Sequence, residues 1–263
     1  MPGAPLVSYI EWLALIGSCL TAAKLYRSGL YHRYRVFFAY FLIRVPNALF
    51  PLFLNHKSPA YFRYWVLSEP LVWMFYIWVV LELCGLVLER HKGLYTLGKW
   101  AMFAGMTVSV AIALLSVFAK IKAAPPQHSF SQRVSIVGYF YAADRAITLC
   151  LAVFLLLMLL LLSRYPVALS RNVVVHTSLY TVFFLSNTLS LILATVLGVK
   201  SFASLEAATT LVSALCVLAW FVFLTPEGEA VRVNIPHFTP EHEERILYHL
   251  DSINTVLLRV AHK

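Results

Sequence analysis

Charged residues are scarce in this chain. Asp, Glu, Lys and Arg make up 13% of its 263 residues, and hydrophobic residues make up 60%. A soluble domain usually carries charge on roughly a quarter of its residues. A soluble domain of this length could not bury so much apolar surface, so the composition excludes that class. The alternating ten-residue segments of a membrane barrel are missing as well.

Motifs for common catalytic and metal sites are also missing. There is no P-loop, no GxSxG sequence and no HExxH sequence. The four cysteines occur singly inside apolar runs, without the CxxC spacing of a metal or redox site. We therefore expect no metal and no cofactor. Enzymatic activity is not favoured, although a hydrolase that uses Glu69 and Asp144 stays open.

What the chain has instead is seven long apolar runs. Each reaches the roughly 20 residues that a helix needs to cross the hydrocarbon core. They predict an all-α, polytopic membrane protein with a seven-transmembrane-helix bundle over 1–224 and a tail over 225–263. The runs lie at about 5–23, 36–54, 63–89, 99–118, 136–163, 172–198 and 201–224.

The basic residues predict the orientation of this bundle. Thirteen lysines and arginines fall in the first, third and fifth connections and the tail, against six in the other connections. Positive residues are retained in the cytoplasm, so we expect the N-terminus outside and the C-terminus inside a cell membrane, most simply a bacterial inner membrane. The net charge of +9 then reflects topology and attraction to lipid, and nucleic acid is not an expected partner.

The tail predicts an amphipathic helix over about 240–261. Thr239, Pro240 and Glu241 form a start signal for this helix. A narrow apolar stripe follows at alternating spacings of four and three: Ile246, Leu250, Ile253, Leu257 and Val260. Such a helix rests on the membrane or the bundle, or forms a short coiled coil with a second copy. It is also a candidate contact for a cytoplasmic protein partner.

Arg44 is the most informative charge within the apolar runs. A charge at membrane depth costs about 3 kcal/mol on insertion scales, so it normally faces a protein interior or a water-filled cavity. Arg44 lies near the middle of the second run and shares a helical stripe with Tyr40 and Asn47. Two interpretations stay open: a ligand contact, or an ion pair with a carboxylate that locks helix packing.

Two further runs carry candidate companions of Arg44. Glu69 shares a stripe with Trp73 and Tyr76 on the third run, and Tyr141 shares one with Asp144 on the fifth. Arg145 points about 100° away from Asp144, and this pair is either buried or at the outer interface. The predicted ligand-binding set is therefore Arg44, Glu69, Asp144, Arg145, Tyr40, Asn47, Trp73, Tyr76 and Tyr141.

Other polar residues of the runs have weaker or different interpretations. Glu11 and Glu206 lie close to the outer end of the first and seventh runs, above Ser18 and in line with Thr210 and Ser213. Glu82 and His176 form a candidate proton relay on the inner side. The simpler interpretation of Glu82 is a carboxylate that meets a cytoplasmic lysine or arginine, and that of His176 is a hydrogen-bonded packing residue.

The predicted span number and orientation resemble the topology of receptor-like seven-helix proteins. The short loops are similar to those of bacterial seven-helix integral membrane proteins. This resemblance covers topology only and brings no activity or site residue. We expect a receptor or sensor that binds a small ligand in an outward-facing polar and aromatic pocket and signals through a separate partner. A proton-coupled carrier that uses the same carboxylates and a non-catalytic assembly factor are the alternatives.

Overall fold

The computed structural model describes residues 4–53, 58–88, 92–123, 130–164, 169–197, 202–230 and 232–233, together with 248, 251–252 and 255. Seven long helices account for most of these residues. They are α1 (Ala4–Arg27), α2 (Arg35–Phe53), α3 (Pro59–Val87), α4 (Lys92–Ala123), α5 (Phe130–Arg164), α6 (Arg171–Leu197) and α7 (Phe202–Phe223). The predicted all-α class is confirmed, and each predicted apolar run falls on one of these helices.

Local sequence explains two of the helix boundaries. Gly29 follows α1 with φ of 73°, a left-handed conformation that glycine adopts without steric cost. The chain then passes through a 3-10 turn, η1 (Leu30–His32), into α2. At the start of α3, the Ser58 hydroxyl accepts a hydrogen bond from the Tyr61 amide at 3.1 Å, and Pro59 occupies the first helical position.

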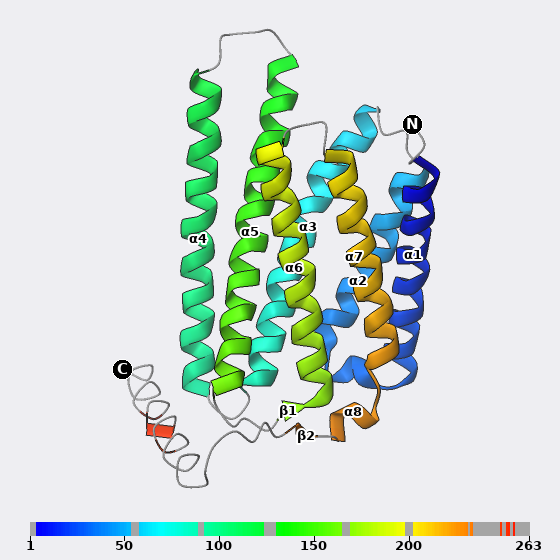
Figure 1. The fold of residues 1–263 in the computed structure, drawn as a ribbon, viewed down its shortest axis with the longest axis vertical. Helices are drawn as coiled ribbons and strands as arrows, with labels where there is room; N and C mark the ends of the chain where they lie inside the picture. Colours follow the sequence, from blue (N-terminus) through cyan, green and yellow to red (C-terminus); the bar gives the residue numbers. More distant parts are fainter. Residues whose placement is uncertain are drawn as a thin grey trace.

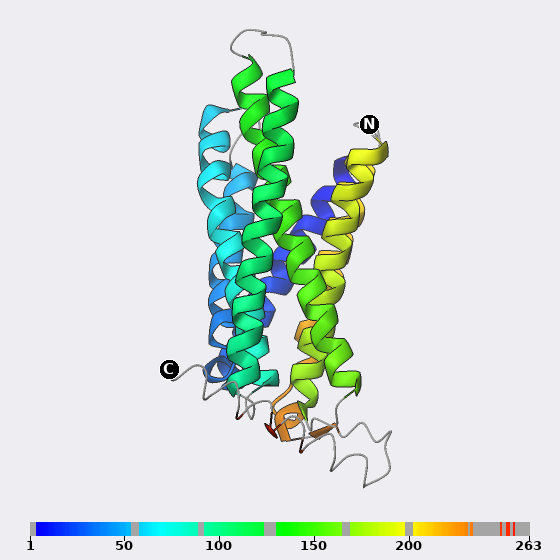
Figure 2. The same cartoon turned by 90° about the vertical axis from the view of Figure 1, so that its left-hand side faces the viewer.

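Six of the long helices close into a ring. Contacts run from α1 to α2, α2 to α3, α3 to α5, α5 to α6, α6 to α7 and α7 back to α1. Helix α4 packs against α5 and more lightly against α3, outside the ring, as the two views in Figures 1 and 2 show. The interior of the molecule is therefore lined by α1, α2, α3, α5, α6 and α7.

A short cap covers one end of the ring. After α7 the chain turns at Thr225 and Pro226 into α8 (Glu227–Ala230). Two two-residue strands, β1 (Leu169–Ser170) and β2 (Arg232–Val233), then pair antiparallel. Figure 1 shows this cap below α6 and α7, at the end where α1 finishes and α2 begins.

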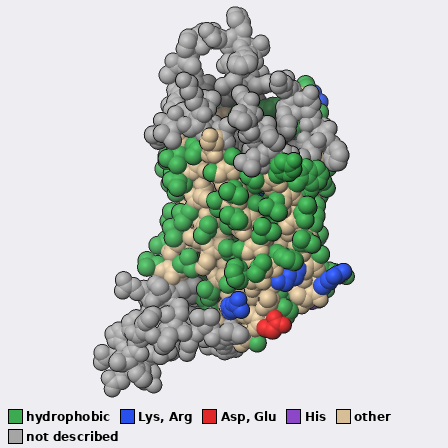
Figure 3. All heavy atoms as spheres, turned by 45° about the vertical axis from the view of Figure 1, so that its right-hand side comes forward, with side chains coloured by type: hydrophobic (Ala, Val, Ile, Leu, Met, Phe, Trp, Pro, Cys, Tyr) green, Lys and Arg blue, Asp and Glu red, His purple; other side chains and the backbone are tan. Residues whose placement is uncertain are grey.

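The outer surface of the helices is apolar. Large hydrophobic side chains are exposed on every long helix, among them Ile16, Leu42, Trp78, Ile112, Leu157, Leu189 and Leu215. On the face shown in Figure 3, hydrophobic side chains cover a broad zone, with lysine and arginine side chains at its lower edge. Helix α3 and residues Val137–Leu160 of α5 are long and apolar enough to cross a membrane. Only 33% and 44% of their most apolar windows are buried within the fold.

The tail helix predicted over about 240–261 lies almost entirely outside the described residues. Its two interpretations, a membrane-bound helix and a coiled coil, stay predictions.

Candidate functional site

Arg44 lies inside the ring, and its contacts are to neutral groups. Its guanidinium donates hydrogen bonds to the Tyr40 hydroxyl and to Ser213 Oγ, the latter at 2.7 Å. Its guanidinium carbon also lies 5.7 Å from the centre of the Tyr40 ring. Within the described part of the chain, no carboxylate oxygen forms an ion pair with Arg44. Helices α2 and α7 therefore hold this charge without a compensating anion from the described side chains.

A cavity of about 520 Å³ surrounds this guanidinium. Five helices line it: α1, α2, α3, α6 and α7. Its apolar wall includes Phe75, Tyr76 and Phe183, and its polar wall includes Asn47 and Asn187. The volume lies within the roughly 300–1,000 Å³ that is usual for small-molecule sites.

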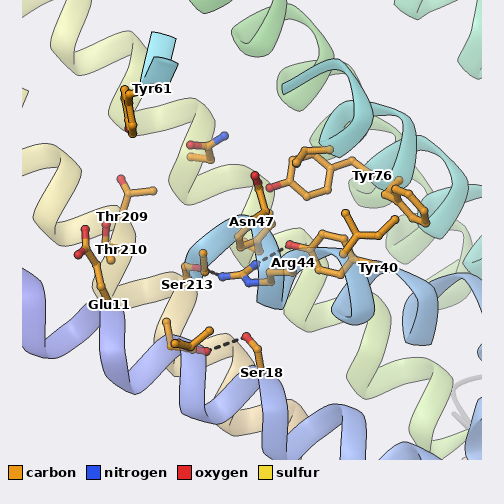
Figure 4. A pocket seen from close by; sticks show the side chains of 18 residues that line it. Glu11, Ser18, Tyr40, Arg44, Asn47, Tyr61, Tyr76, Thr209, Thr210 and Ser213 are labelled. Carbon is orange, nitrogen blue, oxygen red and sulfur yellow. Dashed lines mark hydrogen bonds between the residues drawn. The ribbon is translucent and has the colours of Figure 1, made fainter. Parts of the chain in front are cut away.

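Helices α1 and α7 supply a second polar side to this cavity. Glu11 of α1 and Thr209, Thr210 and Ser213 of α7 line it. Figure 4 shows Glu11, Thr209 and Thr210 together on one side, with Arg44 next to Ser213 toward the middle. We call the part of the bundle around Glu11, Arg44 and Ser213 the cavity half.

A group of acids lies between α3 and α5, beside the cavity. The Trp73 indole donates to Asp144 Oδ1 at 2.9 Å, and the Asn187 side chain also hydrogen-bonds to Asp144. Glu69 is hydrogen-bonded to the Trp65 side chain. Asn187 is thus shared between the cavity wall and the Asp144 carboxylate.

The predicted ligand-binding residues divide into two groups in space. Tyr40, Arg44, Asn47 and Tyr76 line the cavity together. The other five belong to the neighbouring α3–α5 region and do not line it: Glu69, Trp73, Tyr141, Asp144 and Arg145. Helix α3 connects the two groups, because Tyr76 lines the cavity and Trp73, about one turn away on the same helix, donates to Asp144 Oδ1.

Below the cavity the ring is filled with aromatic side chains. The His176 imidazole is completely buried, 4.1 Å from the Phe37 ring and 5.8 Å from the Trp220 ring, centre to centre. Tyr34 and Tyr180 complete this arrangement. Within the described residues neither ring nitrogen of His176 has a hydrogen-bond partner. We call this region, around Phe37, His176 and Trp220, the packed half.

Glu82 of α3 binds the beginning of α2. Its two carboxylate oxygens accept hydrogen bonds from the Val36 and Phe37 amides, at 2.9 and 3.1 Å. The first amides of a helix have no partner within it, and the helix dipole makes this end positive. Glu82 therefore caps α2 from a neighbouring helix. Lys24 does the converse, donating to the carbonyls of Phe221 and Val222 in the last turn of α7.

The cap is held by a cluster around Glu229, which we call the end cluster. The Glu229 carboxylate accepts hydrogen bonds from the Tyr34 hydroxyl and from Asn172 Nδ2, and pairs with Arg33 at 2.9 Å. Asn172 Nδ2 also donates to the Thr225 carbonyl at 2.7 Å. Burial, and then the bond to Glu229, raises the pKa of Tyr34, so the phenol stays a donor.

Close packing in the end cluster explains one glycine. A Cβ on Gly228 would lie 2.1 Å from Asn172 Oδ1, so a larger residue must displace that amide. The sequence pattern did not predict this cluster. Its one signal is the polar Thr225–Glu229 segment, where two acids flank a glycine directly after an apolar run.

The cavity also contains residues outside the predicted set. Glu11, Asn187 and Ser213 line it, and each could be identified from sequence only as a polar residue on a helical stripe. The side chain of Glu206 lies outside the described residues. Comparisons of the chain with protein-family models, curated proteins and solved structures found no match.

Proposed function

We propose that this chain is a multi-pass membrane protein whose seven long helices all cross the bilayer. The support is the apolar outer surface on every long helix together with the two helices that meet the length and hydropathy requirement. Core helices of a soluble protein are mostly buried, whereas more than half of each of these two windows is not buried within the fold. On the positive-inside rule, the end cluster and α8 face the cytoplasm, and the N-terminus of α1 faces outward.

Within this bundle we propose a receptor-like or sensor-like site for a small ligand that carries an anionic group. The observation that carries the proposal is Arg44: it lines a cavity and its contacts are two neutral hydroxyls. A guanidinium has five N–H donors in a planar fork that suits a carboxylate or phosphate. An anion in the cavity would compensate a charge that the described residues leave without one.

The aromatic packing below the cavity favours a receptor over a carrier. Phe37, His176 and Trp220 fill the interior between the cavity and the cytoplasmic end. Glu82, a candidate relay group, already accepts two backbone hydrogen bonds. Transport would require the aromatic packing to separate. The third alternative, an assembly factor, would need Arg44 to serve packing through an ion pair.

Ligand-dependent thermal stabilisation tests this proposal. The full chain, purified in detergent, is screened against a panel of small carboxylates and organic phosphates, with the unfolding midpoint as readout. At least one compound should raise the midpoint, and Arg44→Gln should abolish that rise while the exposed Arg63→Gln control retains it. A rise that Arg44→Gln leaves unchanged would contradict the proposal, as would no rise with any compound.

A further inference from the structure

A second charged residue of the cavity has no ion pair within the described part of the chain. Glu11 lines the same cavity as Arg44, and its side chain is exposed. Across the described residues neither an ion pair nor a hydrogen bond engages the Glu11 carboxylate. The cavity wall therefore presents one cationic and one anionic side chain, and the two do not pair with each other.

The two charges are separated along the helices that line the cavity. Arg44 bonds to Ser213, while Thr209 and Thr210 lie about one turn earlier on α7, roughly 5 Å along its axis. Figure 4 shows Glu11 on the side of these two threonines. A small molecule between the two sides therefore meets Arg44 at one end and Glu11 at the other.

From this geometry we infer that the ligand is zwitterionic, with a carboxylate that binds Arg44 and a cationic amino group that binds Glu11. The inference rests on the proposed function and names the ligand class for the same cavity. A simple anion would satisfy Arg44 but would approach the like charge of Glu11, which opposes binding. A ligand that carries both charges satisfies both side chains and adds no net charge to the cavity.

The remaining walls indicate where each part of such a ligand lies. Ser213 and Tyr40 already hold the Arg44 guanidinium, so its orientation is fixed before a carboxylate arrives. The Thr209 and Thr210 side chains line the side nearest Glu11, where Thr209 Oγ1 already donates to the Leu205 carbonyl and is hydrogen-bonded to Ser190 Oγ. Phe75, Tyr76 and Phe183 are available for an apolar side chain. An α-amino acid is the simplest molecule with these three parts.

The test compares matched ligands that differ by one charged group. Binding of the twenty common L-amino acids to the full chain in lipid nanodiscs is measured by calorimetry. Each binder is then compared with the monocarboxylate that lacks its amino group and the amine that lacks its carboxylate. We expect at least one amino acid to bind tenfold or more tightly than either of its two analogues. Glu11→Gln should reduce this preference over the monocarboxylate to less than threefold.

Glu227→Gln, which neutralises an exposed acid of α8 away from the cavity, is the matched control and should preserve the preference. Carboxylates that bind through Arg44 with equal affinity whether or not they carry an amino group would overturn this inference and leave the proposed function standing. So would an amino-acid preference that Glu11→Gln leaves intact. If no carboxylate-bearing compound binds in an Arg44-dependent way, the proposed function fails as well.

Discussion

The two halves of the bundle treat their charged residues in opposite ways. In the packed half and the end cluster beside it, Glu82 accepts hydrogen bonds from two amides of α2, and Lys24 donates to carbonyls of α7. Glu229 of the end cluster pairs with Arg33. In the cavity half, Arg44 contacts hydroxyls and Glu11 has no partner among the described residues. Charges in the packed half and the end cluster satisfy the free backbone groups of helix termini and hold the cap. Charges in the cavity half line the cavity.

This difference separates structural from functional explanations of membrane charge. Helix termini leave four amides or four carbonyls without partners, and an opposite charge satisfies them at little cost. A charge at membrane depth without a counterion costs free energy, and such charges usually mark a ligand site or an ion pathway. The role of a charged residue therefore follows from whether it lies at a helix end or in the middle of a helix. Its presence in an apolar run does not distinguish the two roles.

The largest effect on the packed end should come from Gly228→Ala. The new Cβ would lie 2.1 Å from Asn172 Oδ1 and would displace the amide that bonds Thr225 and Glu229. We expect a loss of about 2–4 kcal/mol in stability, measured as a lower unfolding midpoint in detergent. Gly85→Ala is the matched control, since its Cβ would meet nothing closer than 3.7 Å. Equal midpoints for the two variants would contradict the described packing of the cap.

A smaller loss is expected from Glu82→Gln. The amide keeps one oxygen acceptor and loses the charge, so either Val36 or Phe37 loses its partner at the start of α2. Such a change costs about 1–2 kcal/mol. The unfolding midpoint of Glu227→Gln, an exposed acid, provides the reference. If Glu82→Gln matches this reference, the carboxylate does not cap α2, and the proton-relay interpretation of Glu82 gains support.

The smallest effect at this end should follow Arg33→Gln. The Arg33 side chain is 41% exposed, and solvent screens its pair with Glu229. We expect at most about 1 kcal/mol of destabilisation, further reduced by added salt. Unfolding midpoints at low and high salt, compared with those of Arg63→Gln, test this. A large, salt-independent loss would mean that the end cluster depends on this ion pair.

The lengths of the apolar runs located the seven long helices, because each run is long enough for one long helix. Helical periodicity placed Tyr40, Arg44 and Asn47 on one face, since residues three and four apart share a helical stripe. It could not predict that α4 lies outside the ring, because neighbouring helices are not encoded in a single helix's periodicity. For the same reason it grouped Asp144 and Glu69 with Arg44, whereas these two carboxylates do not line the cavity.

The end cluster was beyond sequence reasoning for a different reason. The cluster joins Asn172 of α6 to Gly228 and Glu229 of α8, and Asn172 and Glu229 are 57 residues apart in the sequence. Helix α8 is too short to show a periodic pattern. Only their packing reveals that Gly228 must lack a side chain. Glu82 illustrates the same limit: its sequence position suggests a basic partner, whereas its oxygens bind backbone amides.

The central claim is that Arg44 serves the cavity and not helix packing, and one comparison tests it most directly. Unfolding midpoints of the wild type and Arg44→Gln are measured in the same detergent, with and without a stabilising carboxylate ligand. We predict that the ligand-free midpoints differ by the equivalent of less than about 1 kcal/mol, because the substitution removes a desolvated charge along with two hydrogen bonds, and that the ligand-induced rise disappears. A ligand-free loss as large as that of Gly228→Ala, restored by a second substitution at an acidic residue, would contradict the claim.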